Sequence, residues 1–426
     1  MTTPRPTNDV QRIVDAWRDD LNLARMVATE LGESGDLDLT VDLVAVGKAA
    51  REMAAAAAAA FGSRLRRRLV IVDEARGSDD DAVLVAEHPV PGPGSLRAAE
   101  RLIDFLDGPT TAACTVFMIS GGASSLCALP APPLDLADLA SVWAAALTTG
   151  VDITVLNRLR ASVSALAGGA VLRHVRTDRS LSLIMVDNVI SGARWVASGL
   201  TYDYRPDAAE VRSLLDRVGL LDTDVGAAVL RASDHHNALV ERPARVRHQN
   251  RVVAEPAVLL SAASEEARRC GYRVVSVGGN LHGDVADVAH LFAAAIDREA
   301  RHGDACCVIG VGEVTVSVHG DGLGGRCQEL AWSMAPILGP MTRDCVFAAR
   351  ASDGRDFLAG VGGAWVDPTT LTRARDAGFD WSDVLERHDS HAPLAALGQL
   401  FDGAPTGWNL CDLYVACVGP PATGGR

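Results

Sequence analysis

The chain of 426 residues contains a single lysine, Lys48, although lysine and arginine together number 40. Lys48 follows an apolar run that ends at Gly47 and precedes an alanine-rich stretch, which predicts a strand, a tight turn and a helix start. In a parallel α/β sheet this turn lies at the carboxyl edge of the strands, where ligands bind. A lysine ammonium is a compact charge that the broad fork of arginine does not replace. Lys48 is therefore a candidate catalytic residue, the alternative being a surface lysine retained by chance.

A second candidate is the loop Ser120-Gly121-Gly122-Ala123-Ser124-Ser125, which follows a buried-strand pattern. Consecutive glycines let backbone N–H groups turn toward an anion, and hydroxyls add donors, so the loop can form a phosphate cradle. A turn that needs glycine only for its backbone geometry fits this stretch equally well. The chain has no Gly-x-x-x-x-Gly-Lys-[Ser/Thr] motif, which excludes a P-loop.

A third candidate is Arg326, which opens a predicted helix directly after Gly320-Asp-Gly322-Leu-Gly324-Gly325. These glycines fit Gly-x-Gly-x-x-Gly, but two strands expected at 305–310 and 314–318 indicate a hairpin rather than the βαβ unit of a dinucleotide site. A guanidinium beside a glycine-rich turn can bind a phosphoryl group or a carboxylate through two hydrogen bonds. The alternative is a solvent-facing arginine in an arginine-rich chain.

Acidic residues that end predicted strands or occupy glycine-rich turns are Asp187, Glu313, Asp353, Asp356 and Asp412. Carboxylates in such places commonly hold Mg2+ through one or two ligands, with waters and substrate phosphates completing the shell. Each one singly is more often a turn or helix-cap residue. The polar segment 234–237, Asp-His-His-Asn, is expected to be a solvated loop rather than a transition-metal site.

Strand-like and helix-like runs alternate along the chain, and this alternation predicts βαβ units. We expect an α/β fold with two domains, each with a mostly parallel sheet. The N-terminal domain spans 1–250 and the C-terminal domain 251–419, and 420–426 forms a tail. Expected strands are 42–47, 69–73, 114–119, 182–187, 272–277, 305–310, 314–318, 345–350 and 412–418. Expected helices include 8–32, 49–61, 95–107, 135–149, 154–176, 209–219, 223–232, 255–269, 283–300, 326–337, 369–376 and 391–400.

The formal charge of −14 and the pI near 5.2 argue against a nucleic-acid or anionic-membrane partner, because both need a cationic surface. The nine cysteines contain no Cys-x-x-Cys pair and lie mostly in apolar runs, which indicates buried free thiols in a reducing compartment. The N-terminus lacks an apolar signal core. These features predict a soluble cytoplasmic protein.

Stretches in the same order over nearly the whole chain resemble the glycerate 2-kinase family of the MOFRL type, the class-II glycerate kinases. They are Val46-Gly47-Lys48-Ala49-Ala50, His88-Pro89-Val90-Pro91, Ile119-Ser120-Gly121-Gly122-Ala123-Ser124, Leu156-Asn157-Arg158-Leu159-Arg160, Gly168-Gly169, Asp187, Ala197-Ser198-Gly199-Leu200-Thr201, Gly312-Glu313-Val314-Thr315-Val316, Gly324-Gly325-Arg326-Cys327-Gln328-Glu329, Ser352-Asp353-Gly354-Arg355-Asp356, Asp389-Ser390 and Pro405-Thr406-Gly407-Trp408-Asn409-Leu410-Cys411-Asp412-Leu413.

The resemblance implies two α/β domains with the active site in the cleft between them, and phosphorylation of the 2-hydroxyl of D-glycerate with ATP and Mg2+. The implied partners are a nucleotide and a small hydroxyl acceptor, and a homodimer is compatible with the family. On this reading Lys48 and Arg326 are catalytic. The remaining roles are phosphate binding by Ser120, Gly121, Gly122, Ser124 and Ser125, acceptor binding by Asn157, Arg160 and Asn409, and metal binding by Asp187 and Asp353.

Several positions depart from the family pattern, and most of the changes remove a polar group. The expected Gly-Pro-Thr-Asp after Asp356 reads Phe357-Leu358-Ala359-Gly360, and the second acidic residue expected after Asp187 is missing. A small polar acid such as glycerate needs many hydrogen bonds, and losing one at a buried site costs about 1–3 kcal/mol. The sequence therefore leaves open a different sugar, cyclitol or polyol acceptor, a silent ligand-binding protein, and a dinucleotide-dependent oxidoreductase.

Overall fold

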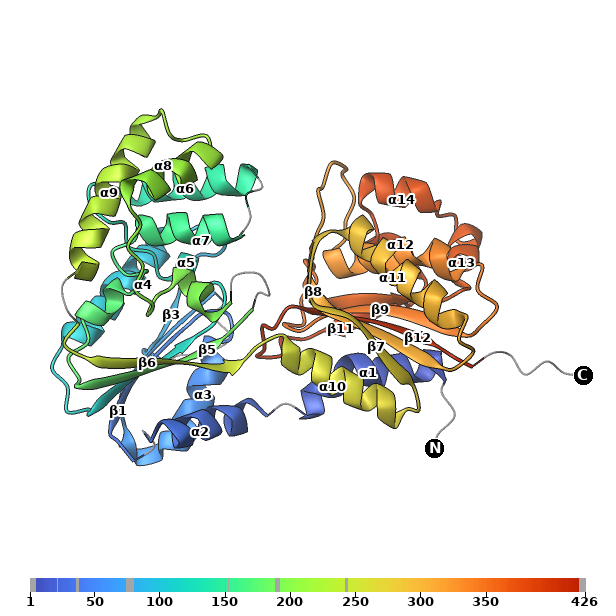
Figure 1. Cartoon of the computed structure of the whole chain (residues 1–426), viewed down its shortest axis with the longest axis horizontal. Helices are drawn as coiled ribbons and strands as arrows, with labels where there is room; N and C mark the ends of the chain where they lie inside the picture. Colours follow the sequence, from blue (N-terminus) through green and yellow to red (C-terminus); the bar gives the residue numbers. More distant parts are fainter. Residues whose placement is uncertain are drawn as a thin grey trace, which may run out of the picture. The chain divides into compact units, whose positions relative to one another are not determined.

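The structure, a computed structural model, describes residues 5–20, 22–35, 38–73, 80–149, 151, 153–187, 192–241 and 244–420. The stretch 188–191 and all but the first residue of the expected tail lie outside these ranges. The chain forms two compact units (Figure 1). We call Leu23–Glu255 the Lys48 unit, and Met1–Asn22 together with Pro256–Arg426 the Arg326 unit. The predicted boundary near 250 lies close to the observed one, but the first 22 residues belong with the C-terminal part of the chain.

The Lys48 unit is built on a six-stranded sheet in the order β3-β2-β1-β4-β5-β6, in which every pair is parallel. Its strands are β1 (Val41–Val46), β2 (Leu65–Val72), β3 (Val83–Val85), β4 (Cys114–Ile119), β5 (Arg179–Met185) and β6 (Arg247–Ala254). Strands β1 and β4 are buried along their whole length, as expected for central parallel strands covered on both faces. The chain first adds β2 and β3 on one side of β1, and then crosses back to add β4 on the other side. The strand order therefore reverses between the neighbours β1 and β4.

Helices cover both faces of this sheet, with α2 and α3 on one side and the others on the opposite side (Figure 1). They are α2 (Leu23–Ser34), α3 (Ala50–Phe61), α4 (Pro93–Asp107), α5 (Ala123–Leu126), α6 (Leu136–Thr148), α7 (Ile153–Ser162), α8 (Ala208–Arg217) and α9 (Asp224–Glu241). A second apolar core, separate from that of the sheet, joins α6, α7, α8 and α9 through residues such as Trp143, Leu159 and Leu215.

The Arg326 unit contains a six-stranded sheet in the order β11-β10-β9-β12-β8-β7. Its strands are β7 (Arg273–Asp284), β8 (Cys306–Thr315), β9 (Cys345–Ala351), β10 (Gly360–Val366), β11 (Leu400–Gly403) and β12 (Asp412–Val418). Its helices are α1 (Pro6–Asp20), α10 (Ala257–Arg269), α11 (Val285–Ala300), α12 (Arg326–Leu338), α13 (Thr370–Asp376), α14 (Trp381–Arg387) and α15 (His391–Ala396). Helices α1 and α10 lie on one face, and α11 and α12 on the other (Figure 1).

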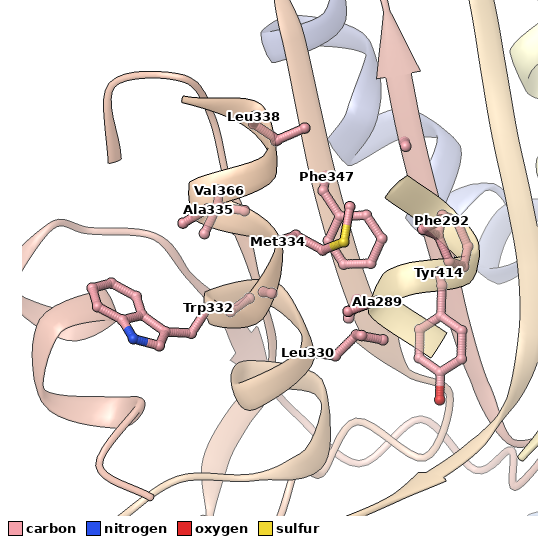
Figure 2. Close-up of a cluster of buried hydrophobic side chains, with 14 of the residues drawn as sticks. Ala289, Phe292, Leu330, Trp332, Met334, Ala335, Leu338, Phe347, Val366 and Tyr414 are labelled. Atoms are coloured by element: carbon pink, nitrogen blue, oxygen red, sulfur yellow. The ribbon is translucent and has the colours of Figure 1, made fainter. Parts of the chain in front are cut away.

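Aromatic side chains fill the core between this sheet and helices α11 and α12. Figure 2 shows Phe292 of α11 between Phe347 of β9 and Tyr414 of β12, with Leu330 and Met334 of α12 beside them. The rings meet edge to face, with centroids 5.2 Å apart for Phe292 and Phe347 and 6.4 Å apart for Phe292 and Tyr414. This geometry suits the quadrupoles of aromatic rings, and α12 packs on the same core as α11.

The prediction of a mostly parallel sheet in the second domain is wrong. Only β7 and β8 pair in parallel, and the other four pairs are antiparallel. The prediction omitted β10 and β11, because the glycines of Gly360–Val366 indicate a turn. In the structure Gly363 has a φ of 131° and a side chain there would overlap the carbonyl of Ala349, so the glycine permits close strand pairing.

The predicted hairpin at 305–318 is also wrong, because residues 306–315 form the single strand β8. Gly312 lies inside this strand, where a Cβ would overlap the backbone of Leu281 on β7. The segment 234–237 belongs to helix α9, and its His236 is fully buried. The expected helix 8–32 is two helices, α1 and α2, in different units. Strands β3 and β6 and helix α14 were not predicted.

The prediction of buried free thiols is confirmed, since all nine cysteines are free and buried. Within the described part of the chain, no helix has the length and apolar character needed to cross a membrane.

Candidate active site

Lys48 lies at the point where the Lys48 unit's sheet changes direction, directly after β1 and beside the loop after β4. The neighbouring Gly47 has a φ of 125°, and a side chain there would overlap Ser120. The N–H of Lys48 donates to the carbonyl of Gly121 at 2.9 Å, and the N–H of Ala49 donates to the hydroxyl of Ser120 at 3.1 Å. These contacts bind the two predicted candidates, the lysine turn and the glycine loop, into one structure at the ligand-binding edge of the sheet.

Gly122 brings the side chains of Lys48 and His88 together. It has a φ of 87°, and a Cβ at this position would lie 3.2 Å from Cδ2 and 3.3 Å from Nε2 of His88, and 3.3 Å from Cγ of Lys48. The imidazole and the lysine stem therefore approach the same glycine. Desolvation, with the positive charges of Lys48 and Arg160, lowers the pKa of His88 to about 4, so the ring is neutral at pH 7.

Arg160, on helix α7, adds a second cation to this region. Its guanidinium lies over the ring of Trp143 at 4.8 Å from the centroid, and burial lowers its pKa to about 10. Its Nε and the Nε1 of Trp143 are buried donors that have no hydrogen-bond partner. Both residues line a small cavity together with Ser124 and Ser198. Buried donors without partners favour a ligand or water that supplies acceptors.

A chain of hydroxyls connects the glycine loop to helix α7. The Oγ atoms of Ser124 and Ser198 are 2.7 Å apart, and Ser198 donates to Oδ1 of Asn157 at 3.3 Å. Ser198 and Ala197 have φ angles of 53° and 56°, which is a strained conformation for residues other than glycine and is often found at functional sites. The structure thus places the predicted residues Ser124, Asn157 and Arg160 near one another.

Neither Lys48 nor Arg160 forms an ion pair with a carboxylate of the described residues. Two cations around a glycine turn, without internal counter-charges, suit an anionic ligand such as a phosphate. The other two hydroxyls of the loop face the protein instead. Ser120 is fully buried behind the lysine turn, and Ser125 donates to the carbonyl of Pro89 at 2.6 Å.

Arg326 is the first residue of α12 and belongs to a second polar cluster, in the Arg326 unit. Its Nε and Nη2 donate to the two oxygens of Asp412 at 2.6 and 2.8 Å, and Nη2 lies 3.7 Å from Glu313. Burial raises the pKa of Asp412 to about 7, while the bidentate pairing with Arg326 opposes this rise. The arginine side chain remains 25% exposed. Nη1 is not used by this pair and can reach a ligand.

Asp356 fixes the beginning of α12. Its two carboxylate oxygens accept the N–H groups of Cys327 and Gln328, each at 2.9 Å. A carboxylate at this end of a helix satisfies free N–H groups and interacts favourably with the helix dipole. A side chain at Gly325 would overlap Asp356, so this glycine makes room for the cap. Both carboxylate oxygens of Asp356 therefore accept hydrogen bonds that cap α12, which indicates a structural role rather than metal binding.

The segment Gly320–Gly325 does not form an open dinucleotide loop. A side chain at Gly320 or Gly322 would overlap the backbone of Arg387, and one at Gly324 would overlap the hydroxyl of Ser390. The N–H of Gly322 donates to the carbonyl of Arg387 at 2.8 Å. The glycines thus allow close packing against the chain's own loop after α14.

The two predicted metal ligands belong to different units. Asp187 follows β5 and is half-buried. Asp353 is also half-buried, and its Oδ1 accepts the N–H of Arg355 at 2.8 Å. The described residues contain no group of three or more side chains that could hold a metal ion. The remaining predicted residue, Asn409, lies in the Arg326 unit near the start of β12 and is 9% exposed.

The site residues that sequence reasoning missed are His88, Trp143 and Ser198. His88 and Ser198 stand in stretches that resemble the family, which was the available signal for them. Trp143 has no such signal, because only the packing of α6 against α7 brings it beneath Arg160.

Two family models match the chain. A domain of unknown function, DUF4147, matches residues 9–232, and the MOFRL family matches residues 306–412. A protein from Agrobacterium vitis, provisionally named a hydroxypyruvate reductase, is 30% identical over 343 residues, which cover 79% of this chain and 77% of that protein. The D-glycerate 2-kinase of Thermotoga maritima is 27% identical over 388 residues, covering 89% of this chain and 90% of the kinase.

A solved structure also resembles this chain over nearly its whole length. The crystal structure of a glycerate kinase from Thermotoga maritima superimposes with a TM-score of 0.81 at 26% identity, covering 96% of this chain and 98% of that one.

Proposed function

The chain belongs to the family that combines the DUF4147 and MOFRL domains, and from this premise we propose that it is a kinase of the glycerate 2-kinase type. It transfers a phosphoryl group from a nucleotide to a hydroxyl of D-glycerate or a closely related polyhydroxylated acceptor. The observation that carries the proposal is the pairing of Lys48 with Gly121 and Gly122, where the cations Lys48 and Arg160 have no carboxylate partner. Relatives and a structural neighbour named glycerate kinases support it.

We assign the donor as ATP and its phosphates to the glycine loop. The N–H groups of Gly121 and Gly122 and the hydroxyl of Ser124 serve as donors, and Lys48 supplies positive charge to the transferring group. Ser120 and Ser125 shape this loop through their contacts with Ala49 and Pro89.

The acidic residues proposed as Mg2+ ligands are few. Asp187 and Asp353 offer one carboxylate each, and no larger ligand group exists among the described residues. This agrees with the habit of Mg2+ to use one or two carboxylates together with waters and phosphate oxygens. When bound, Mg2+ would neutralise the phosphates, and the candidates for its carboxylate ligand are Asp187 in the Lys48 unit and Asp353 in the Arg326 unit.

We also propose acceptor-binding roles for Asn157 and Arg160 in the Lys48 unit and for Asn409 in the Arg326 unit. Arg326 is proposed to stabilise the charge that develops on the phosphoryl group. Arg326 pairs with Asp412 through two hydrogen bonds. This pairing orients the remaining N–H donors of Arg326 in advance, so the reaction requires no reorganisation energy to place them.

A different, less polar acceptor is a second candidate. Phe357, which is 69% exposed, stands where the family pattern has glycine, and Ala359 and Gly360 replace its threonine and aspartate. The buried free cysteines support a reducing compartment such as the cytoplasm, and a homodimer is compatible with the proposal.

Two measurements test this function. A coupled assay of ADP release with ATP, Mg2+ and a panel of acceptors, from glycerate to sugars and cyclitols, should show turnover with at least one small hydroxy compound. A lysine-directed acyl-phosphate analogue of ATP should label Lys48, the single lysine, and excess ATP should protect it. Peptide mapping separates this product from labelling of the N-terminal amine. Absence of both turnover and ATP-protected labelling would refute the kinase assignment.

A further inference from the structure

The loop that carries His88 is held in place on both sides of the histidine. The preceding residue, Glu87, accepts the N–H groups of Gly94 and Ser95 at 3.1 and 2.8 Å, at the start of α4. The following residue, Pro89, accepts the hydroxyl of Ser125 at 2.6 Å. His88 as a whole residue is exposed, although the groups around its imidazole desolvate the ring enough to lower its pKa. An exposed side chain between two anchored neighbours is preorganised for contact with a ligand.

The ring of His88 points to the place where the transferring group is assigned. Its Nε2 and the stem of Lys48 lie at equal distance, 3.3 Å, from the side-chain position that Gly122 leaves empty. Among the described residues, no hydrogen bond or ion pair involves a ring nitrogen of His88. A neutral imidazole has one donor and one acceptor nitrogen, so both are available to a ligand beside the glycine loop.

We propose that His88 accepts the proton of the acceptor hydroxyl during phosphoryl transfer, an inference that rests on the kinase function proposed above. The acceptor oxygen forms its bond to the γ-phosphorus as the bond from this phosphorus to the β,γ-bridging oxygen breaks. The hydroxyl proton moves to the free nitrogen of His88, and ADP leaves. His88 later returns the proton to solvent through its exposed edge.

The charges around His88 make this base dependent on bound ligand. The charged groups that act on it are Lys48, beside the same glycine, and Arg160, on α7, and both lower its pKa. Anionic ligands that neutralise these cations remove this effect, so the pKa rises when nucleotide and acceptor bind. A weak base in the free protein becomes a stronger one in the loaded complex, which suits a transition state that needs only late proton removal.

The kinetic test uses His88→Asn, which preserves a neutral polar side chain but cannot accept the proton. We expect kcat to fall about 100-fold or more, with the KM for ATP and the melting temperature close to those of the unchanged protein. The acidic limb of the kcat profile should lie at higher pH than that of kcat/KM, and it should be lost in the variant. The control is His235→Asn, an exposed histidine of the same unit, which should leave kinetics unchanged.

A threefold or smaller change in kcat, or an equal loss of kcat and ATP affinity, would overturn the inference. A separate readout does not need turnover. With histidine labelled at 13Cε1, NMR titration should give His88 a pKa near 4 in the free protein, and a higher value with the β,γ-imido analogue of ATP and Mg2+. The resonance missing from His88→Asn assigns the signal. A pKa that does not respond to the analogue, in a protein that turns over an acceptor, overturns the role of His88 alone. Absence of both turnover and ATP-protected labelling of Lys48 refutes the kinase function and, with it, the inference that rests on it.

Discussion

Lys48 differs from many arginines of the chain in having no carboxylate partner among the described residues. Several arginines of the chain form ion pairs, such as Arg67 with Asp42 and Arg251 with Glu30. Lys48 has no such partner among the described residues and is only half-buried. An ammonium in this position is available to an incoming anion. The aliphatic stem of Lys48 lies beside Gly122, in the glycine loop.

At this scale the first prediction is that Lys48→Arg lowers kcat by about 100- to 1000-fold, the usual cost of losing one donor aimed at the transition state. The broad guanidinium does not replace the compact ammonium, whereas the turn itself is held by contacts that do not involve the lysine side chain. Steady-state kinetics check the loss, and circular dichroism and thermal melting check the fold. The control is Arg97→Lys on the exposed face of α4, which should keep full activity. Near-normal turnover of Lys48→Arg would contradict the catalytic role.

The composition of the chain was enough to select Lys48, and the glycine-flanked position was enough to select Arg326. His88 could not be chosen in the same way, because its importance depends on a glycine 34 positions away in the chain that carries no side chain. Ser120 was assigned to the ligand because a serine beside two glycines suggests a donor. Ser120 is completely buried behind the lysine turn. This burial depends on the turn that follows the neighbouring strand β1, about 70 residues earlier in the chain, so the residues around Ser120 do not predict it.

At the scale of elements, the N-terminus of α12 depends on a cap that comes from a distant loop. We predict that Gly325→Ala destabilises the protein by about 1–3 kcal/mol. The added methyl group displaces Asp356, which leaves the N–H groups of Cys327 and Gln328 without their acceptor. It should also lower kcat by moving Arg326. Denaturant unfolding and kinetics measure the two effects.

The control for this change is Gly279→Ala in strand β7 of the same unit. A Cβ at this position would lie 3.7 Å from its nearest neighbour, so stability should change little. Equal stability of the two variants would show that the cap does not hold α12.

Helix α11 and strand β7 are joined by an ion pair with a predictable pH dependence. Glu299 is 6% exposed and accepts from Arg273 at 2.5 Å and from Arg298 at 2.8 Å. Hydrogen bonds from Arg273 and Arg298 lower the pKa of Glu299 below its ordinary value of 4.5. A carboxyl with a lowered pKa contributes stability above its unfolded pKa and loses it as the pH falls through the folded value.

We therefore predict that Glu299→Gln lowers the free energy of unfolding at pH 7 by about 1–3 kcal/mol. The difference from the unchanged protein should shrink as the pH falls below 4.5. Urea unfolding at a series of pH values measures it. The comparison variant is Asp297→Asn on the same helix, whose pair with Arg301 is exposed on both sides and should matter little. A pH-independent difference for Glu299→Gln would exclude the ion pair as its cause.

The elements that the sequence predicted well are those with uninterrupted apolar runs. Strands β4 and β12 were placed at their exact ends, because each is buried throughout and has no glycine. Strands β10 and β8 were missed or divided, because their glycines serve close strand pairing, which looks the same in sequence as a turn. The wrong prediction of a mostly parallel second sheet followed from that error. Once β10 is recognised, its short connection to β9 indicates an antiparallel pair, because a parallel pair needs a longer crossover.

At the scale of the whole molecule, the first helix is separated from the rest of its unit by more than 230 residues of chain. Helix α1 packs on α10 and beneath β9 and β12. Its Ile13, Val14 and Trp17 are buried, and Asp9 accepts the hydroxyl of Tyr272 at 3.0 Å. Asp15 accepts from Arg350 at 3.2 Å, and this arginine is itself 2% exposed. The prediction of a helical stretch at 8–32 missed its division into α1 and α2 and could not tell which sheet α1 covers.

This arrangement predicts that a change near the N-terminus destabilises the C-terminal unit. Trp17→Ala removes a 1% exposed side chain, at a cost of about 3–5 kcal/mol. Amide deuterium exchange measured by mass spectrometry should rise in α10, β9 and β12, while β1 and β4 keep their protection. The reciprocal control is Leu31→Ala in α2, a fully buried residue of the other unit, which should deprotect β6 and α3 instead. Faster exchange in β1 and β4 of Trp17→Ala, with β9 and β12 unchanged, would mean that α1 stabilises the Lys48 unit.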